Sequence, residues 1–256
     1  MKIHVSSFCW QCFNETDRSS ESYEKIKKET GSRDLLLEFN EDNSYIIECS
    51  KGHKSESRLQ NQKFELLFDM GTMALNDGYS KECVSTLASS LERFIEFVIK
   101  FVCTKHSIEV ENYIKMWKQM SNQSERQLGA FYALQTIEFG YPKFSLDNNK
   151  VTFRNKVVHK GYIPSKQEAL EFGQYVLDFI VKCSKELKLI DEKSFDKALH
   201  FDFYKNGVRI PLIQLQSSMQ IPSIISGFMP IEETPDFEKS ANDILTNSFY
   251  NHFYHK

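Results

Sequence analysis

The hydrophobic pattern in the middle of the chain is helical. Apolar residues recur three and four positions apart over Ser80–Lys105, and this spacing predicts one long amphipathic helix. A second long helix is predicted to begin at Ser165, because Pro164 precedes it and Ser165 with Glu168 has the form of a capping box. Weaker helical patterns cover 64–76 and, with a break near residue 121, 109–139. Antiparallel helices joined by short turns pack economically, so residues 61–190 are expected to form a helical bundle.

The two ends of the chain follow a different pattern. Three short apolar runs predict a small β element in residues 1–60, and the polar stretch between them is typical of a loop or a short exposed helix. In residues 191–256, Asn206-Gly207 between two apolar runs predicts a β-hairpin, and Thr234-Pro235 predicts the start of a helix that runs to about Tyr254. The runs that predict strands are 3–7, 34–39, 45–48, 200–204 and 208–215. The predicted fold class is mainly α, a bundle with a small N-terminal β element and a small α+β C-terminal extension.

Composition places the chain among globular proteins. It has 256 residues, of which 41% are hydrophobic, and this apolar share excludes wholesale disorder. No apolar stretch approaches the roughly 20 residues that a membrane span needs, and residues 1–13 lack the apolar core of a secretory signal. We therefore expect a cytoplasmic protein with no membrane partner, whose six cysteines are reduced, buried or metal-bound.

Positive charge is concentrated in one segment. The net charge of the chain is -3, yet residues 143–166 contain six lysine and arginine residues against Asp147 alone. A local positive field in an acidic chain predicts a confined anionic ligand, such as a phosphate group or a short stretch of RNA. A solvated lysine-rich face is the commoner explanation of such a cluster, and the charge pattern alone leaves both open.

Four residues near the N-terminus have the spacing of metal ligands. Cys9 and Cys12 form a Cys-x2-Cys pair, and Cys49 with His53 forms a Cys-x3-His pair. Zinc prefers such thiolate and imidazole ligands, and four protein ligands leave no open coordination position, so a structural zinc ion is predicted. A metal would also stabilise a 60-residue segment that is too small to build much core. The segment resembles a zinc ribbon in general form, and the alternative is ordinary buried cysteines beside a surface histidine.

A second candidate site lies within the basic segment. Arg154 and His159 frame an Arg-x4-His motif, with Asn155 next to the arginine. The local sequence is ambiguous between strand and helix, because several of its residues are β-branched. In a helix, Asn155 and His159 share one face, whereas Arg154 lies about 140° around the axis from His159. Convergence then needs the arginine side chain to curl round, or a second copy of the helix to face the first.

This arrangement resembles the HEPN superfamily of nucleotide-binding domains. The resemblance covers about 63–190, with a long helix carrying Leu91-Glu92, the motif at Arg154–His159, and Gly161-Tyr162-Ile163-Pro164 before the last long helix. It implies an all-α up-and-down bundle, often dimerised so that two motif helices form one cleft. Many members are metal-independent endoribonucleases of toxin–antitoxin, abortive-infection and CRISPR effector systems, so the resemblance implies work in defence or as a toxin.

The resemblance implies a role for each residue of the motif. His159 would act as general base or acid while the ribose 2′-OH attacks the adjacent phosphate, because imidazole exchanges a proton near neutral pH. Arg154 would bind the phosphate oxygens, and Asn155 would orient the imidazole or donate to the phosphate. Lys156 and Lys160 would bind the flanking RNA backbone. The implied active unit is a homodimer without a catalytic cofactor, and a protein inhibitor or activator would be a further partner.

Other interpretations of the sequence stay open. The bundle could be a non-catalytic HEPN-like module that binds RNA or nucleotide and dimerises, with the zinc element as an adaptor. A weaker alternative is a zinc-ribbon transcription accessory factor that prefers duplex DNA. A subset of the family carries tyrosine two positions after the histidine, where this chain has Gly161, so regulation by tyrosine modification is not expected. Hydrolysis of nucleoside triphosphates has no support, because the sequence contains no Gly-rich phosphate loop.

Overall fold

A computed structural model describes residues 2–5, 8–26, 28–29, 35–40, 43–201, 217–219, 221, 223–226, 234–246 and 254–255. The chain divides into two compact units. The first, here called the β unit, combines Met1–Asn61 with Asn206–Pro222 and Thr246–Lys256. The second, here called the helical unit, combines Gln62–Lys205 with Ser223–Leu245. Residues 191–256, which the sequence pattern groups as one extension, are thus divided between the two units.

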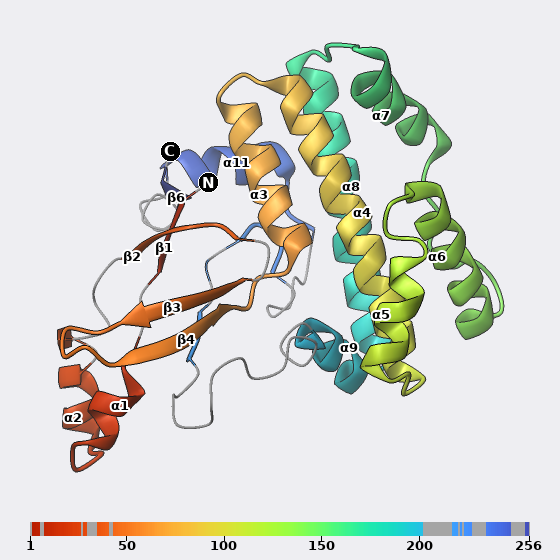
Figure 1. The fold of residues 1–256 in the computed structure, drawn as a ribbon. Helices are drawn as coiled ribbons and strands as arrows, with labels where there is room; N and C mark the ends of the chain where they lie inside the picture. The colour runs from red at the N-terminus through yellow and green to blue at the C-terminus, as the bar shows by residue number, and fades with distance from the viewer. Residues whose placement is uncertain are drawn as a thin grey trace. The chain divides into compact units, whose positions relative to one another are not determined.

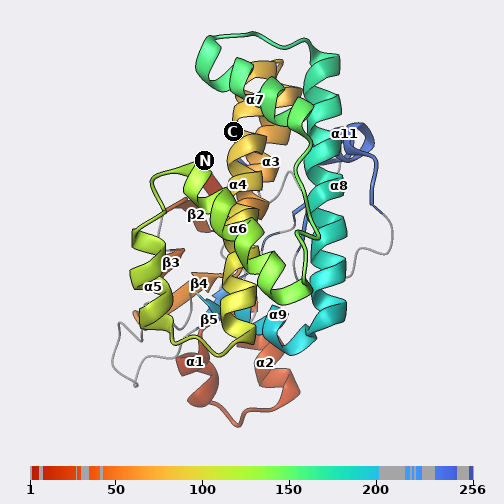
Figure 2. The ribbon, with the colours of Figure 1, turned by 90° about the vertical axis from the view of Figure 1, so that its right-hand side faces the viewer.

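The helical unit is built around one long helix (Figures 1 and 2). Helix α4 contacts five other helices, α3, α6, α7, α8 and α9. The helices are α3 (Lys63–Asn76), α4 (Ser80–Lys105), α5 (Val110–Lys118), α6 (Ser124–Phe139), α7 (Asn148–Lys160), α8 (Lys166–Ile190), α9 (Glu192–Leu199) and α11 (Phe237–Thr246). Phenylalanines dominate the core, and those with no more than 2% of their surface exposed include Phe64, Phe68, Phe94, Phe97, Phe101, Phe131, Phe172, Phe195 and Phe237. Because so many rings pack around α4, burial of aromatic surface holds this unit together.

Two glycines allow close approach within this core. At Gly71 of α3 an added Cβ would lie 2.9 Å from Leu87 of α4. At Gly173 of α8 an added Cβ would lie only 2.0 Å from the ring of Phe237, at the start of α11. The neighbouring Gln174 accepts a hydrogen bond from the Phe237 backbone N–H at 2.7 Å. The absence of a side chain at Gly173 is therefore what lets α11 pack against α8.

Two small sheets and two short helices lie in the described residues of the β unit. One sheet has the antiparallel order β2-β1-β6, and the other has the order β3-β4-β5, in which β3 and β4 are antiparallel and β4 and β5 parallel. The strands are β1 (Lys2–Val5), β2 (Leu35–Glu38), β3 (Ser44–Glu48), β4 (Lys54–Leu59), β5 (Ser217–Met219) and β6 (Tyr254–His255). The helices are α1 (Trp10–Asn14) and α2 (Ser20–Ile26). In the register of β3 with β4, Glu48 pairs with Lys54, so only a five-residue loop joins the two strands.

The mainly helical fold class is confirmed, and so are the helices predicted in the middle of the chain. Helix α4 has the predicted bounds, and α5 and α6 are separated by a break that contains Ser121. Ser165 caps α8, because its side chain accepts from the Glu168 backbone N–H while the Glu168 carboxylate accepts from the Ser165 N–H. The Arg-x4-His motif, whose local sequence is ambiguous between strand and helix, is helical and lies within α7.

The predictions for the C-terminal part were less successful. His200 caps the end of α9, so the predicted strand over 200–204 is wrong at its start, and residues 202–216 lie outside the described residues. Helix α11 begins at Phe237 rather than at Thr234, because Asp236 accepts the Lys239 backbone N–H. The predicted continuation to Tyr254 is also wrong, since that residue pairs with β1 in strand β6.

No helix in the described part of the chain has both the length and the apolar character that crossing a bilayer requires.

Candidate functional site

The Arg-x4-His motif lies on a short, well-capped helix. The Asp147 side chain caps the start of α7 by accepting the Asn149 backbone N–H at 2.7 Å. Gly161 ends the helix with φ +70°, a left-handed conformation that glycine adopts without strain, and its N–H reaches the Lys156 carbonyl. Val157 faces the core and is fully buried. These contacts fix both ends and one face of α7, so the face that carries the motif has a defined direction.

Four helices enclose a pocket beside the motif, here called the α7 pocket. Its volume is about 370 Å³, and its lining comes from α4, α6, α7 and α8 together with Leu146. The apolar part of the lining includes Leu91, Ile95, Leu128, Val151, Phe172 and Tyr175. The polar part consists of Glu92, Ser124, Glu125, Lys150, Arg154, Asn155, His159 and Lys160. Three lysine and arginine side chains therefore face two carboxylates, and the pocket carries a small positive excess before histidine is counted.

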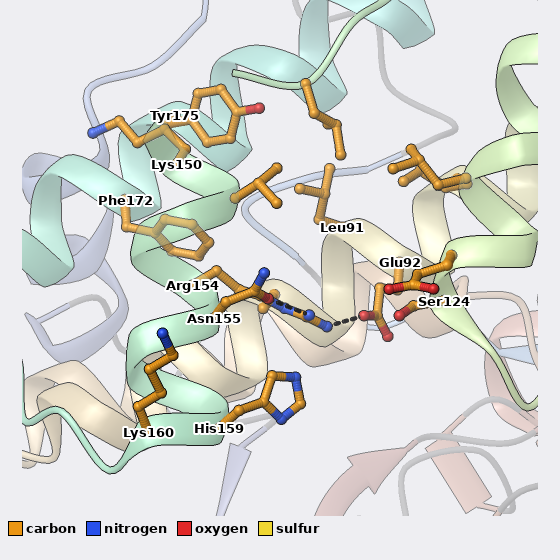
Figure 3. A pocket seen from close by; sticks show the side chains of 16 residues that line it. Leu91, Glu92, Ser124, Lys150, Arg154, Asn155, His159, Lys160, Phe172 and Tyr175 are labelled. Atoms are coloured by element: carbon orange, nitrogen blue, oxygen red, sulfur yellow. Dashed lines mark hydrogen bonds and ion pairs between the residues drawn. The ribbon is translucent and has the colours of Figure 1, made fainter. Parts of the chain in front are cut away.

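Arg154 is held in place by two partners (Figure 3). Its Nη1 donates to Asn155 Oδ1 at 2.9 Å, and its Nη2 forms an ion pair with the Glu92 carboxylate of α4. The two ionic side chains are only about one quarter exposed, at 22% and 28%. Two of the five N–H groups of the guanidinium are engaged in this way, so its plane is fixed at the pocket wall.

His159 and Lys160 lie at the exposed side of the same pocket. Both side chains line it, and both are exposed. In Figure 3 the imidazole lies on the same side of α7 as the Arg154 guanidinium, one turn along the helix from Asn155. The structure thus brings Arg154, Asn155, His159 and Lys160 together at one opening.

Lys156 does not belong to this group. Its ammonium lies over the ring of Tyr162, 4.8 Å from the ring centroid, and the residue does not line the pocket. Tyr162 in turn donates to Glu168 at 2.8 Å. Of the two lysines expected to bind the RNA backbone, Lys160 lines the pocket and Lys156 does not.

Several pocket residues were not anticipated as site residues. The sequence pattern places Glu92 in the long helix and gives it no role in the site, yet it forms the ion pair with Arg154. Ser124 and Glu125 come from the start of α6, and Lys150 lies one turn before Arg154. A sequence signal did exist for Glu92, because a carboxylate within an apolar helix needs a partner.

The four predicted metal ligands meet in the β unit. The ligand atoms of Cys9, Cys12, Cys49 and His53 all lie within 4.8 Å of one another, and these residues could hold a metal ion. The Cys12 and Cys49 sulfurs are 3.8 Å apart, and His53 Nδ1 lies 3.3 Å from Cys12 Sγ and 3.8 Å from Cys9 Sγ. We call this group the Cys/His cluster.

Two backbone turns present these ligands. Cys9 caps α1, where its sulfur accepts the Cys12 backbone N–H at 3.4 Å. Cys49 and His53 bracket the loop between β3 and β4, where Gly52 has φ +81° and the Cys49 N–H bonds to the His53 carbonyl at 3.0 Å. A ligand pair at the end of a tight hairpin has little freedom, so the spacing of the four atoms is set by the backbone.

Neighbouring groups change the pKa of one thiol in the cluster and contact its histidine. Burial, with hydrogen bonds to Cys9 and Cys49, raises the pKa of the Cys12 thiol to about 12, because deprotonation would add charge to a crowded group of thiols. A bound cation would reverse this preference, since it stabilises thiolates. The other nitrogen of His53, Nε2, lies 3.4 Å from a Glu15 carboxylate oxygen. Such an outer carboxylate commonly orients a ligating imidazole.

Comparisons with protein-family models, with curated proteins and with solved structures found no match to this chain.

Proposed function

We propose that the helical unit is an endoribonuclease that cleaves RNA without a metal ion, with the α7 pocket as its active site. The observation that carries this proposal is that Arg154, Asn155 and His159 line one pocket, with the guanidinium oriented by Glu92. An imidazole can take up or release a proton near neutral pH, and a guanidinium can stabilise charge on phosphate oxygens, so the two groups in one pocket suit transfer of a phosphodiester to the ribose 2′-oxygen. The resemblance of the helix order and the motif to the HEPN superfamily supports the same chemistry.

The reaction would proceed in one displacement. A base removes the proton from the 2′-OH, the 2′-oxygen forms a bond to phosphorus, and the bond to the 5′-oxygen breaks as an acid protonates that oxygen. The products are a 2′,3′-cyclic phosphate and a 5′-OH end. Arg154 neutralises the charge that builds on the phosphate oxygens, and Lys160 binds the neighbouring backbone. Such an activity in a cell arrests growth, which is consistent with a role as a toxin or in antiphage defence.

One imidazole serves as base or acid, and two copies of the chain would supply both. We therefore propose that the active unit is a homodimer in which the two α7 helices face each other. Val158 of α7 and Ile163, just after the helix, are 37% and 76% exposed. Val158 precedes His159 and Ile163 follows it by four positions, so a partner chain that packs on these two side chains would bring its own α7 close to His159.

We propose zinc as the ion of the Cys/His cluster, in a structural role. Tetrahedral zinc with Zn–S bonds of about 2.3 Å places its sulfurs roughly 3.8 Å apart, and its sulfur and nitrogen ligands roughly 3.6 Å apart. Three of the six separations among Cys9, Cys12, Cys49 and His53 are 3.3, 3.8 and 3.8 Å, and all six lie within 4.8 Å. Metal analysis of purified protein should find about one zinc per chain, and a metal-free protein would contradict the proposal.

The nuclease is tested with purified protein and single-stranded RNA in the presence of EDTA. We expect cleavage with cyclic phosphate ends, detected by mass spectrometry, and its loss in Arg154→Ala and in His159→Ala. The matched control is His106→Ala, because His106 is likewise exposed, at 52% of its side chain, but lies outside the pocket. Equal cleavage by all variants would indicate a contaminating nuclease and contradict the assignment. Intact RNA that is nevertheless bound would favour the non-catalytic RNA-binding module.

A further inference from the structure

The α7 pocket is larger and more apolar than cleavage of a phosphodiester needs. A phosphate requires only cations and hydrogen-bond donors, yet much of this pocket is lined by Leu91, Ile95 and Phe172, which are 8%, 5% and 1% exposed. These side chains belong to the core and still line a pocket with a volume of about 370 Å³. That volume lies at the lower end of the range of roughly 300–1,000 Å³ found for small-molecule sites, which are also mostly apolar.

The apolar and charged parts of the pocket lie side by side (Figure 3). Phe172 and Tyr175, one helical turn apart on α8, and Leu91 of α4 lie on one side of Arg154, and His159 with Lys160 lies on the other. The hydroxyl oxygen of Tyr175 accepts the Asp147 backbone N–H at 3.0 Å, which fixes the ring at the edge of the pocket. An aromatic and aliphatic chamber thus adjoins a cationic rim.

We propose that this chamber binds one nucleobase of a single-stranded RNA, while the phosphate next to that base rests on Arg154 and the neighbouring backbone on Lys160. A nucleotide is the ligand that combines a flat apolar body with an adjacent anion, and single-stranded RNA is recognised by unstacking a base and burying it against aromatic side chains. The choice of RNA as ligand rests on the proposed function. The base then sets which phosphodiester reaches His159, so the chamber determines the cleavage position.

Duplex RNA and free nucleotides are the competing ligands. A paired base cannot enter the chamber without leaving its stack, so duplex RNA of the same sequence binds more weakly. A free nucleoside 5′-monophosphate has the same base and phosphate but lacks the flanking backbone for Lys160, so it also binds more weakly than the oligonucleotide.

The test is a binding measurement with RNA that cannot be cleaved. The probe is a fluorescently labelled trinucleotide with 2′-deoxy sugars at the reactive positions, compared with the same molecule carrying an abasic central residue. Wild-type protein should bind the intact trinucleotide at least tenfold more tightly than the abasic one, as expected for one base stacked on a protein. Equal affinities would overturn the proposal, and so would binding of the free nucleoside monophosphate as tight as that of the trinucleotide.

Two variants of α6 locate the base. Leu128 is half-buried and belongs to the apolar lining of the α7 pocket, and Leu134 is half-buried on the same helix but outside the pocket. Leu128→Trp fills the chamber and should abolish the tenfold preference, whereas Leu134→Trp should retain it. Folding of both variants is checked by circular dichroism, and the wild-type comparison decides the matter if Leu128→Trp does not fold. A folded Leu128→Trp protein that keeps the preference would overturn the proposal.

This test separates the base site from the nuclease. A protein that cleaves RNA but binds abasic and intact trinucleotides equally keeps the proposed function and loses the base site. A protein that prefers the intact trinucleotide but never cleaves RNA keeps the base site and loses the nuclease.

Discussion

The Cys/His cluster takes its four ligand atoms from two short turns, whereas the α7 pocket takes its lining from four helices spread over more than 80 residues. In the cluster, each pair of ligands is three or four positions apart, and local backbone geometry sets its spacing. In the pocket, only the α7 residues are close in sequence, and the remaining wall depends on how α4, α6 and α8 pack. The comparison predicts that the Cys/His cluster controls the folding of the residues around it, whereas the α7 pocket forms only once the surrounding helices have folded.

Loss of a cluster ligand should have the largest effect on folding. Structural zinc sites contribute about 10–16 kcal/mol of apparent binding free energy near neutral pH, and most of it is folding free energy. In Cys12→Ala we expect the metal to be absent and the β unit to become sensitive to protease, while the helical unit stays resistant and cleaves RNA. Limited proteolysis with mass spectrometry and metal analysis measure both effects.

The matched control for this variant is Cys83→Ala. Cys83 is also fully buried, but it lies in α4, far in sequence from the cluster. Its replacement should leave the metal content unchanged. A Cys12→Ala protein that retains its metal and a protease-resistant β unit would contradict the prediction that the Cys/His cluster controls the folding of the β unit.

Changing Arg154 should give the next largest effect, on activity rather than on stability. Removal of the guanidinium should lower the cleavage rate about 10²–10³-fold, as loss of one preorganised donor to a developing oxyanion does. Arg154→Lys should recover only a small part, because an ammonium keeps the charge but cannot reproduce the planar fork. The melting temperature should fall only modestly, because Arg154→Ala leaves the Glu92 carboxylate, 28% exposed, without its ion-pair partner but does not disturb the apolar core.

Arg126→Ala provides the control for this prediction. Arg126 is exposed on α6 and donates to the Gln119 carbonyl at 3.0 Å, outside the pocket. Cleavage rates are measured in single-turnover experiments with saturating protein. Comparable losses in Arg126→Ala and Arg154→Ala would mean that the arginines act through general charge and that the pocket has no specific role.

The same contrast explains what the sequence could predict. The Cys/His cluster was identified from spacing alone, because Cys-x2-Cys and Cys-x3-His each place two ligands on one turn. Helices α4 and α8 were also predictable, since their apolar stripes are long and Ser165 carries an evident capping box. In these cases the information is local, and local geometry determines the outcome.

The pocket could be predicted only in part. The motif identifies Arg154, Asn155 and His159. Glu92, the ion-pair partner of Arg154, is 62 positions away in sequence. The apolar residues that line the pocket have the same pattern as ordinary core residues. Lys156 and Lys160 are four positions apart on one face of α7, and their spacing predicts a shared role. The Lys156 ammonium nevertheless lies over the ring of Tyr162, a residue beyond the end of the helix. The start of α11 was misplaced because Thr234 and Asp236 are both good caps, and the contact of Phe237 with Gly173 and Gln174 favours the later start.

Packing at Gly173 should have a smaller effect, confined to the helical unit. In Gly173→Ala the new Cβ would lie 2.0 Å from the Phe237 ring, so α11 must move. We expect a loss of about 1–3 kcal/mol in the free energy of unfolding, as overpacked cores show. Gly129→Ala on α6 is the control, because nothing lies within 4 Å of its added Cβ, and it should stabilise the protein by about 0.5–1 kcal/mol. Urea unfolding measures both, and equal effects would show that α11 does not depend on the contact.

The smallest expected effect concerns the end of α6 that lies away from the pocket. Glu138 is only 7% exposed and pairs with Lys105 and His106 at the end of α4. Burial acts to raise its pKa, but the hydrogen bonds from Lys105 and His106 outweigh it, so the pKa lies below its ordinary value of 4.5. A carboxyl group whose pKa is lowered by folding stabilises the folded state above its unfolded pKa, and this contribution is lost as pH falls through the folded pKa.

Glu138→Gln should therefore destabilise the helical unit by about 1 kcal/mol at neutral pH, because Gln keeps an acceptor oxygen and loses only the difference between a hydrogen bond to a charged group and one to a neutral group. The difference from wild type should shrink as the pH falls below about 4.5, because the wild-type carboxyl group then becomes protonated as well. Thermal melting at a series of pH values measures this. If the difference persists unchanged into acid, Glu138 acts through its shape and not its charge. Loss of RNA cleavage in a folded Glu138→Gln protein would show that both ends of α6 hold the pocket wall, and would extend the dependence of the pocket on packing to residues that never line it.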